Sequence, residues 1–279
     1  MHSFVRSSIR SFTHPRVSPD NRPAVRRTAE MASVQAIALR PTTIPMKLVA
    51  VAALKGGTGR TTATMVIASA LDHLGRRIVL FDTDPLEPLL QWQAAARKAG
   101  TWSDRCVAVA TPDLGSVDRA YATAQTENEP DNVDLVLIDL NMRDERITRV
   151  VVPNAAMVLI STGLTSLDVA AATAAYQQVV ELLLEAEAPV ETALLFPRIP
   201  DRELMPVERA GQDALVTLPH MQTMLAERDP FAAMPNRGLL HRLPVTDLRR
   251  ALQHRISPIN SARTETEALA TELLQRIDA

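Results

Sequence analysis

The chain has 279 residues, of which 46 % are apolar and 22 % are charged. This balance is typical of a folded globular protein and excludes a fully disordered or collagen-like chain. A run of about 18 apolar residues is missing, so we expect no membrane insertion. The single cysteine, Cys106, excludes an internal disulfide and a cysteine-built metal cluster. We therefore predict a cytoplasmic protein.

The net charge of −2 conceals two basic segments. Residues 1–46 carry seven arginines and two acids, a net of +5, and residues 228–263 again carry seven arginines and two acids. Clustered arginine attracts phosphate backbones whatever their base sequence. We predict that the second segment forms a basic surface that binds DNA through Arg249, Arg250 and Arg255.

Residues 1–45 mix Arg, Ser and Pro without a sustained hydrophobic period, which predicts a disordered extension. Three interpretations stay open. The segment is a non-structural extension or the result of a mis-set start, with the true start at Met46; it is a basic arm with affinity for DNA; or it is a transit peptide, which has a similar composition. Residues 46–279 are predicted to form a single domain.

From Met46 onward, apolar strands alternate with helices. Strands are predicted at 47–54, 77–81, 106–110, 133–138, 155–160 and 190–196, and helices at 61–74, 86–99, 166–187 and 264–277. The first strand, KLVAVAAL, is apolar throughout, as expected of a strand buried on both faces of a parallel sheet. The last helix has an acidic polar face, which favours packing on the protein over membrane contact. Repeated strand–helix units predict an α/β fold, a doubly wound and mostly parallel sheet with helices on both faces.

The turn after the first strand carries the sequence KGGTGRTT at residues 55–62. Its glycines let the backbone curl so that N–H groups point at phosphates, and the following helix adds its positive N-terminus. The hydroxyl directly after the basic residue of a P-loop binds Mg²⁺, and here that hydroxyl belongs to Thr61. The segment therefore predicts a nucleotide-binding loop.

Carboxylates stand at the ends of two further strands. Asp82 and Asp84 belong to the segment FDTDP, and Asp139 ends the apolar run LVLID. Carboxylates at strand ends that face a phosphate site can hold Mg²⁺ and position water. A single strand-ending Asp often only caps a turn. Three of them in register with a P-loop predict a site for a nucleotide and Mg²⁺.

These motifs resemble those of the ParA/MinD partition-type ATPases. KGGTGRTT is similar to their deviant Walker A box, KGGxGKTT, FDTDP to their second acidic motif, and LVLID to their Walker B motif. The resemblance extends from Met46 to the C-terminus. The segments TWSDRC (101–106), 164–184 and AERDPFAAMPNRGLLH (226–241) most resemble one branch, the ParA-like ATPase of the agrobacterial virulence C operon, which assists T-DNA processing and its delivery to a secretion channel.

The resemblance implies a protein that binds ATP and Mg²⁺, forms an ATP-dependent homodimer and binds DNA to promote conjugative or T-DNA processing. A plasmid or chromosome partition ATPase and an ATP-locked, DNA-binding scaffold with little turnover are alternatives. The resemblance further implies a protein partner, which is a relaxase, a secretion-coupling protein or a centromere-binding protein. It also implies association with the nucleoid or with a cell pole.

The resemblance also implies a role for each residue of the site. Lys55 reaches across the dimer to the partner's phosphates, Asp84 positions the attacking water, and Arg198 contacts adenine. Thr62 binds the α-phosphate, Asp82 lies near the Mg²⁺ shell, and Asp139 holds a Mg²⁺-bound water beside the ligand Thr61. The residues that surround the phosphates are Gly56, Gly57, Thr58, Gly59 and Arg60.

The chain departs from this family pattern twice. Arg60 replaces the P-loop lysine, and a broad planar guanidinium is no simple substitute for a slender ammonium. The Thr-Pro that follows the Walker B aspartate is replaced by Leu140-Asn141. The resemblance implies that this segment senses the γ-phosphate. We therefore expect nucleotide binding with slow hydrolysis, in which Arg60 takes part.

Overall fold

The computed structural model describes residues 46–126, 133–243 and 257–278. The predicted extension at 1–45 and the predicted DNA contacts Arg249, Arg250 and Arg255 lie outside the described residues. Within the described ranges, no helix is both long and apolar enough to cross a membrane.

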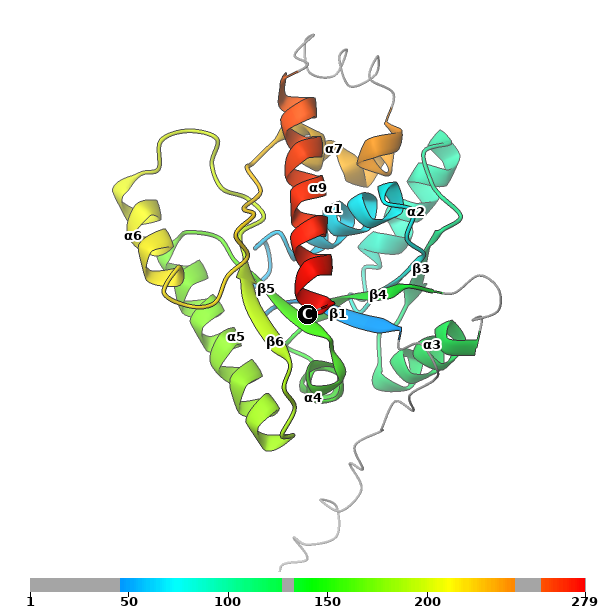
Figure 1. Ribbon diagram of the computed structural model, residues 1–279, viewed down its shortest axis with the longest axis horizontal. Coiled ribbons are helices and arrows are strands. Elements are labelled where there is room, and N and C mark those ends of the chain that lie inside the picture. The colour runs from blue at the N-terminus through cyan, green and yellow to red at the C-terminus, as the bar shows by residue number, and fades with distance from the viewer. Residues whose placement is uncertain (1–45, 127–132, 244–256, 279) are drawn as a thin grey trace, which may run out of the picture. The chain divides into compact units, whose positions relative to one another are not determined.

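Six strands form one sheet in which all neighbouring strands are parallel (Figure 1). They are β1 (Lys47–Ala53), β2 (Ile78–Asp82), β3 (Cys106–Ala110), β4 (Leu135–Asn141), β5 (Met157–Ser161) and β6 (Glu191–Leu195). Their order across the sheet is β3-β2-β4-β1-β5-β6, with β1 in the interior. All residues of β1 after Lys47 are buried, as its apolar sequence predicts. The predicted α/β fold is confirmed.

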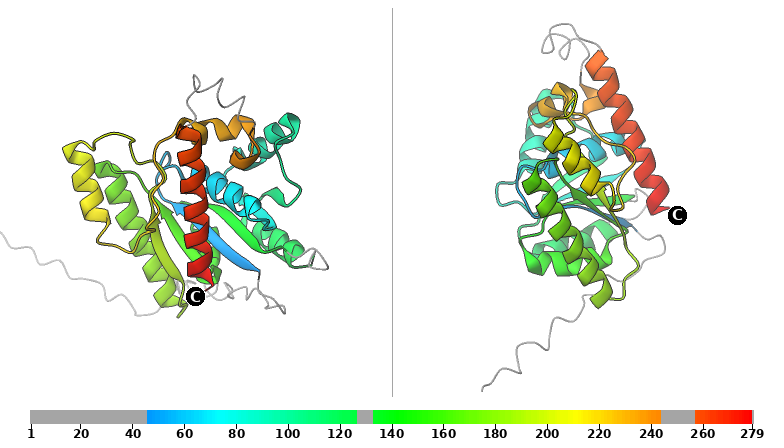
Figure 2. Two further views of the ribbon diagram at one scale, coloured as in Figure 1. Left: turned by 45° about the horizontal axis from the view of Figure 1, so that its top comes forward. Right: turned by 90° about the vertical axis from the view of Figure 1, so that its left-hand side faces the viewer.

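Helices cover both faces of this sheet (Figure 2). One layer holds α1 (Arg60–His73), α2 (Pro88–Ala99), α7 (Asp229–Arg237), the short helix η1 (Leu240–Arg242) and α9 (Ser257–Ile277). The other holds α3 (Leu114–Thr126), α4 (Glu145–Asn154) and α5 (Ser166–Glu185), with α6 (Pro206–Leu215) packed on α5. Alternate side chains of β1 enter the two cores, Val49 and Val51 on one face and Leu48 and Ala50 on the other.

Some element boundaries differ from the predicted ones. The fourth strand was expected to end at Asp139, but β4 continues to Asn141, which pairs with Ala53 of β1. The last helix begins at Ser257, seven residues before the predicted start at 264. Four described α-helices, α3, α4, α6 and α7, and the short helix η1 were not predicted. The start of α4 has a clear cause, since the Asp144 carboxylate accepts the N–H groups of residues 146 and 147.

The acidic face of α9 packs on the protein, as predicted. The Glu272 carboxylate accepts the backbone N–H groups of Gln222 and Thr223 at 2.7 and 2.8 Å. Glu265 forms an ion pair at 2.6 Å with Arg228, which also contacts Asp201 at 3.0 Å. Arg228 was counted in the predicted basic DNA-binding surface. Because two carboxylates neutralise it, that count overstates the free positive charge of the segment.

A buried ionic cluster, which we call the Asp72 cluster, joins the C-terminal end of α1 to two distant segments. Asp72 is fully buried and lies 3.0 Å from His241 Nε2, 3.3 Å from Arg105 Nε and 3.6 Å from Arg242 Nε. Burial alone would raise the pKa of Asp72. The hydrogen bonds from His241 and Ser103 and the charge of Arg105 outweigh it and hold that pKa below its usual value.

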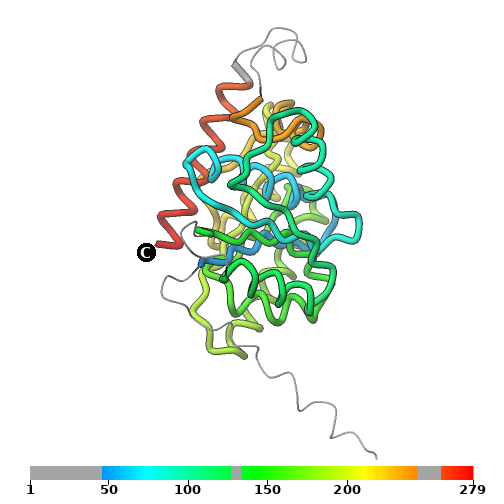
Figure 3. Tube along the Cα trace, turned by 90° about the vertical axis from the view of Figure 1, so that its right-hand side faces the viewer, coloured from blue at the N-terminus to red at the C-terminus, as the bar shows by residue number. Residues whose placement is uncertain are grey.

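The same region brings together two of the segments that single out one branch of the resembled family. Thr101 Oγ1 donates a hydrogen bond to the Arg237 carbonyl at 2.5 Å, and Leu239 N–H donates to the Thr101 carbonyl. Gly238 lies between them with φ of +105°, and a Cβ there would meet Thr101 Oγ1 at 2.2 Å. Figure 3 shows the resulting arrangement, in which α7 lies beside α2. Segments 101–106 and 226–241 thus form one joint.

Candidate nucleotide-binding site

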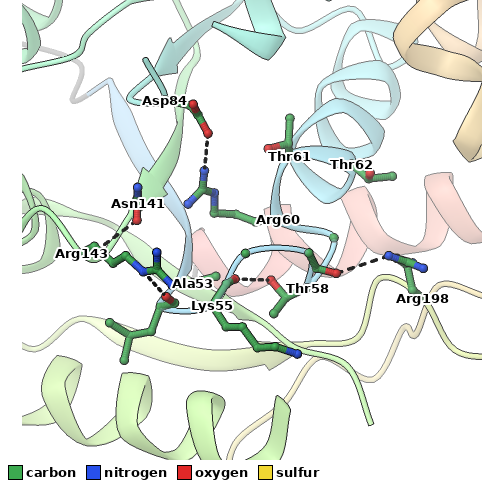
Figure 4. A pocket seen from close by; sticks show the side chains of 14 residues that line it. Ala53, Lys55, Thr58, Arg60, Thr61, Thr62, Asp84, Asn141, Arg143 and Arg198 are labelled. Atoms are coloured by element: carbon green, nitrogen blue, oxygen red, sulfur yellow. Dashed lines mark hydrogen bonds and ion pairs between the residues drawn. The ribbon is translucent and has the colours of Figure 1, made fainter. Parts of the chain in front are cut away.

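The carboxyl ends of β1, β2 and β4 meet at one edge of the sheet and carry the predicted site. Asp82 of β2 is level with Asp139 of β4, and Ala53 of β1 is level with Asn141. The loop after β1 borders a pocket of about 400 Å³ (Figure 4). The pocket is lined by residues 53–62 together with Asp84, Asn141, Arg143 and Arg198.

The conformation of the loop requires its glycines. Gly57 and Gly59 have φ values of +82° and +86°, which favour glycine over residues with a Cβ. A Cβ on Gly59 would lie 2.8 Å from Pro197 Cγ, so this glycine also permits a close approach to the segment after β6. Ser161, at the end of β5, donates a hydrogen bond to the Thr58 carbonyl at 3.0 Å. The neighbouring strands therefore fix the loop at the N-terminus of α1.

Arg60 forms ion pairs with two carboxylates of the site. Its Nε donates to one oxygen of Asp139, and Thr61 Oγ1 donates to the other oxygen at 2.7 Å. Arg60 Nη2 also lies 3.8 Å from Asp84 Oδ2. Burial raises the pKa of Asp139, while Arg60 and Thr61 oppose that rise. The residue that departs from the family pattern is thus ion-paired with both predicted catalytic and metal-binding carboxylates.

Asp82 is placed differently from Asp84. It is fully buried, and its oxygens accept the backbone N–H groups of Asp84 at 3.1 Å and Leu89 at 2.7 Å. Burial, with smaller contributions from the charges of Asp139 and Asp84, raises the pKa of Asp82 to about 6. Asp82 thus orders the turn between β2 and α2, and its place near a Mg²⁺ shell stays a prediction.

Lys55 points toward α5 of its own chain, away from Arg60 (Figure 4). Its Nζ lies 2.5 Å from Asp168 Oδ1. Asp168 also forms a capping box with Thr165 at the start of α5. Burial raises the pKa of Asp168, but hydrogen bonds from Lys55 and Thr165 bring it below its usual value. Lys55 is therefore held by a carboxylate within the monomer.

Arg198, the predicted adenine contact, lies on another side of the loop. Its Nη1 donates to the Gly57 carbonyl at 3.3 Å, and its Nη2 is 3.1 Å from Glu227. The side chain lines the pocket and is half exposed. Its position beside the loop is compatible with the predicted contact, which stays a prediction.

Sequence reasoning missed Arg143, which follows β4 and lines the pocket. Its side-chain Nε donates to the Leu54 carbonyl at 3.1 Å, and its backbone N–H donates to Asn141 Oδ1 at 3.2 Å. Asn141 N–H in turn donates to Thr83 Oγ1, whose hydroxyl hydrogen bonds to the Asp139 carbonyl. The available signal was an arginine four residues after a strand-end aspartate, close to the missing Thr-Pro.

The Asp72 cluster contains a second arrangement with the residue types of a catalytic triad. Ser69 Oγ lies 3.3 Å from His241 Nδ1, and His241 Nε2 faces Asp72. Ser69 is only 1 % exposed, and its oxygen accepts the Leu240 N–H at 2.8 Å. A substrate carbonyl has no route to this hydroxyl. We therefore assign the arrangement to structure rather than to catalysis.

The donor set at the pocket fits Mg²⁺. Thr61 supplies a hydroxyl and Asp139 a carboxylate, and hard oxygen ligands of this kind suit that ion. If Mg²⁺ bound there together with a nucleotide, it would neutralise part of the phosphate charge. Arg60 already occupies one Asp139 oxygen, so the guanidinium has to leave that oxygen before a metal ion can use it.

The fold and the glycine-rich loop at 55–62 together define a P-loop protein of the ParA/MinD architecture. Solved structures of ParA and MinD proteins share this fold. The pNOB8 ParA structure matches with a TM-score of 0.58 and 14 % identity over 84 % of this chain and 99 % of that chain. The MinD cell division protein of Aquifex aeolicus matches with a TM-score of 0.54 and 16 % identity over 82 % and 97 %.

Within this class, the chain belongs to the VirC1 family, because the family model described as VirC1 protein matches residues 46–279. The virC1 protein of Rhizobium rhizogenes is 37 % identical over 196 residues, which are 70 % of this chain and 83 % of that protein. The virC1 protein of Rhizobium radiobacter is 34 % identical over the same shares. The resemblance to the branch of the virulence C operon is thereby confirmed.

Proposed function

We propose that this protein is a nucleotide-dependent switch that binds ATP with Mg²⁺, dimerises in the ATP-bound state and binds DNA to promote T-DNA or conjugative processing. The observation that carries the proposal is the convergence of the 55–62 loop and Asp84 on one pocket, with Asp139 hydrogen-bonded to the lining residues Arg60 and Thr61. Membership of the VirC1 family supports the processing role. Binding of fluorescent ATP and ADP analogues tests the nucleotide site directly, and failure to bind either would remove the proposal.

The ion pair between Lys55 and Asp168 sets a condition for the proposed dimerisation step. If Lys55 is to contact the phosphates bound by a partner copy, it must first leave Asp168, with which it is paired at 2.5 Å. Lys55→Ala should then abolish ATP-dependent dimerisation, while nucleotide binding by the monomer survives better. Sedimentation with a slowly hydrolysed ATP analogue measures this difference. An unchanged dimer fraction would argue against the cross-dimer role.

DNA binding through the 228–263 segment is a separate element of the proposal. Changing Arg249, Arg250 and Arg255 to Glu should weaken binding to any DNA sequence alike. Each lost phosphate contact should flatten the slope of log affinity against log salt by about 0.9. Arg228→Glu is not a suitable control, because Arg228 forms ion pairs inside the fold. A triple variant that binds DNA as tightly as the unchanged chain would remove this element.

The ion pairs of Arg60 favour a second candidate, an ATP-locked scaffold with little turnover. A guanidinium already bound by Asp139 and Asp84 is poorly placed to stabilise a transferring phosphoryl group. Steady-state phosphate release with and without DNA distinguishes the candidates. An ATPase releases phosphate over many turnovers, whereas a scaffold releases less than one equivalent during the lifetime of its complex.

A further inference from the structure

Four basic side chains line the pocket, and three of them are neutralised by carboxylates of the same chain. Lys55 pairs with Asp168, Arg60 pairs with Asp139, and Arg198 pairs with Glu227. The fourth is Arg143. Among the described residues, no carboxylate lies within ion-pair distance of it. The pocket therefore contains one uncompensated positive charge, contributed by the loop after β4.

Arg143 is also held in a fixed orientation. Its Nε donates to the Leu54 carbonyl, immediately before the phosphate loop. In the described ranges, neither of its terminal nitrogens has a hydrogen-bond acceptor. An arginine held at Nε keeps its two terminal NH₂ groups as donors, and this planar donor set matches phosphate oxygens. The uncompensated charge is thus also an unsatisfied donor set at the pocket.

The location of Arg143 indicates which phosphate of a bound nucleotide it would contact. Two features mark the γ-phosphate end of a P-loop site. One is the basic residue before the hydroxyl ligand, and the other is the set of carboxylates that order the metal ion and water. Arg60, Asp84 and Asp139 occupy that end here, and Arg143 lies four residues after Asp139, in the connection between β4 and α4. Figure 4 shows Arg143 and Arg198 on opposite sides of the loop, with Asn141 on the side of Arg143.

We propose that Arg143 recognises the γ-phosphate, so that the chain distinguishes a nucleoside triphosphate from a diphosphate through this side chain. The inference rests on the proposed nucleotide site and deepens it. Arg143 lies two residues after Leu140-Asn141, which stand where the resembled motif has Thr-Pro, and it supplies a charged donor beside them. Its bond to Leu54 also links the connection after β4 to the loop, so γ-phosphate binding would tighten both segments together.

The experiment compares the affinity of ATPγS, which is hydrolysed slowly, with that of ADP. Both are measured with Mg²⁺ by competition against a fluorescent ADP analogue. In Arg143→Ala, the affinity for ATPγS should fall about tenfold or more, as expected on loss of a charge-assisted hydrogen bond, while the affinity for ADP stays within about twofold. Arg143→Lys, which keeps the charge but not the planar donor set, should fall between Arg143→Ala and the unchanged chain.

Arg146→Ala is the matched control. Arg146 is an exposed arginine three residues further along and is not among the pocket-lining residues, so both affinities should remain unchanged. Thermal unfolding without nucleotide checks that Arg143→Ala is folded, as its exposed position leads us to expect. Equal losses for ATPγS and ADP would show that Arg143 only supports the loop and would overturn the inference, as would no loss for either. If the unchanged chain binds neither ligand, the proposed function itself fails.

Discussion

The two ends of α1 carry similar chemistry with opposite consequences. At its N-terminal end, Arg60 pairs with the buried Asp139 beside a pocket. At its C-terminal end, Asp72 is equally buried and pairs with Arg105 and His241. Of these three residues, only Arg105 lines a cavity, and that cavity is not the one beside Arg60. Buried arginine–carboxylate pairs are therefore not in themselves a sign of function. The glycine-rich loop that borders the pocket beside Arg60 distinguishes the candidate binding site from the structural joint.

The other sizeable cavity shows the same distinction. It has a volume of about 490 Å³ and lies between β3 and α3, where it is lined mainly by aliphatic side chains such as Val107 and Val109. Convergent strand ends are missing from its lining, and so is a glycine-rich loop. The nucleotide pocket is smaller but contains the loop, a carboxylate and four cations. Chemical composition rather than size identifies the site.

The largest effect is expected from breaking the joint at Gly238. Gly238→Ala would force a Cβ to within 2.2 Å of Thr101 Oγ1 at a backbone φ of +105°. Strain and overpacking together should lower the free energy of unfolding by about 4 kcal/mol, measured by urea denaturation. Gly100→Ala is the control, because that glycine also has a positive φ, +68°, but open space around it. Its loss should be about 1 kcal/mol, and equal losses would contradict the packing argument.

The second-largest effect is expected from removing the charge of Asp72 at the centre of the joint. Asp72→Asn should destabilise the protein by about 3 kcal/mol at pH 7, because Arg105 and Arg242 lose their buried counter-charge. The pKa of Asp72 is lower in the folded than in the unfolded chain, so its stabilising contribution is present above the unfolded pKa and is lost as pH falls through the folded pKa. The difference between variant and unchanged chain should shrink on acidification.

Urea denaturation at pH 7 and at two acidic values measures that trend. Glu185→Gln is the control, since Glu185 forms only an exposed ion pair with Arg149 and should change stability by less than about 1 kcal/mol. A difference between Asp72→Asn and the unchanged chain that does not depend on pH would show that packing, and not charge, holds the joint.

At the N-terminal end of α1, the informative substitution is Arg60→Lys. An ammonium fits between β- and γ-phosphates better than a guanidinium, so turnover should rise about tenfold, which corresponds to roughly 1.4 kcal/mol in the barrier. Affinity for ATP should change less than turnover. Phosphate release and nucleotide competition measure the two quantities. An unchanged rate would place the limit elsewhere, and full activity of Arg60→Ala would show that the position has no catalytic role.

The smallest effect is expected at Arg198. This side chain is half exposed and already paired with Glu227, so removing it costs little. Arg198→Ala should weaken ATP and ADP alike by about threefold, in contrast to the selective loss expected for Arg143→Ala. The same competition assay reads both variants. A selective loss of ATP affinity in Arg198→Ala would reverse the orientation proposed for the nucleotide.

The core of the fold was predictable because buried parallel strands are short, apolar and regularly separated by helices. The positions of all six strands were predicted to within two residues at their starts, and the loop at 55–62 lies at the N-terminus of α1 as expected. Four α-helices and the short helix η1 were missed. In α7, which contains Pro235, and in α4, which contains Pro153, a proline interrupts the usual helical pattern, and packing overrides that local preference.

The sequence by itself determined the chemical groups of the candidate nucleotide site, because a P-loop is a local motif in which the glycines, the basic residue and the hydroxyl stand close together in the chain. Tertiary structure decided which charges are paired. Asp168 is 113 residues from Lys55, and Asp139 is 79 residues from Arg60, so no local pattern could reveal either contact. The same holds for Arg143, which is significant only because its three basic neighbours are neutralised. Charge compensation depends on distances in space, and the fold alone sets these.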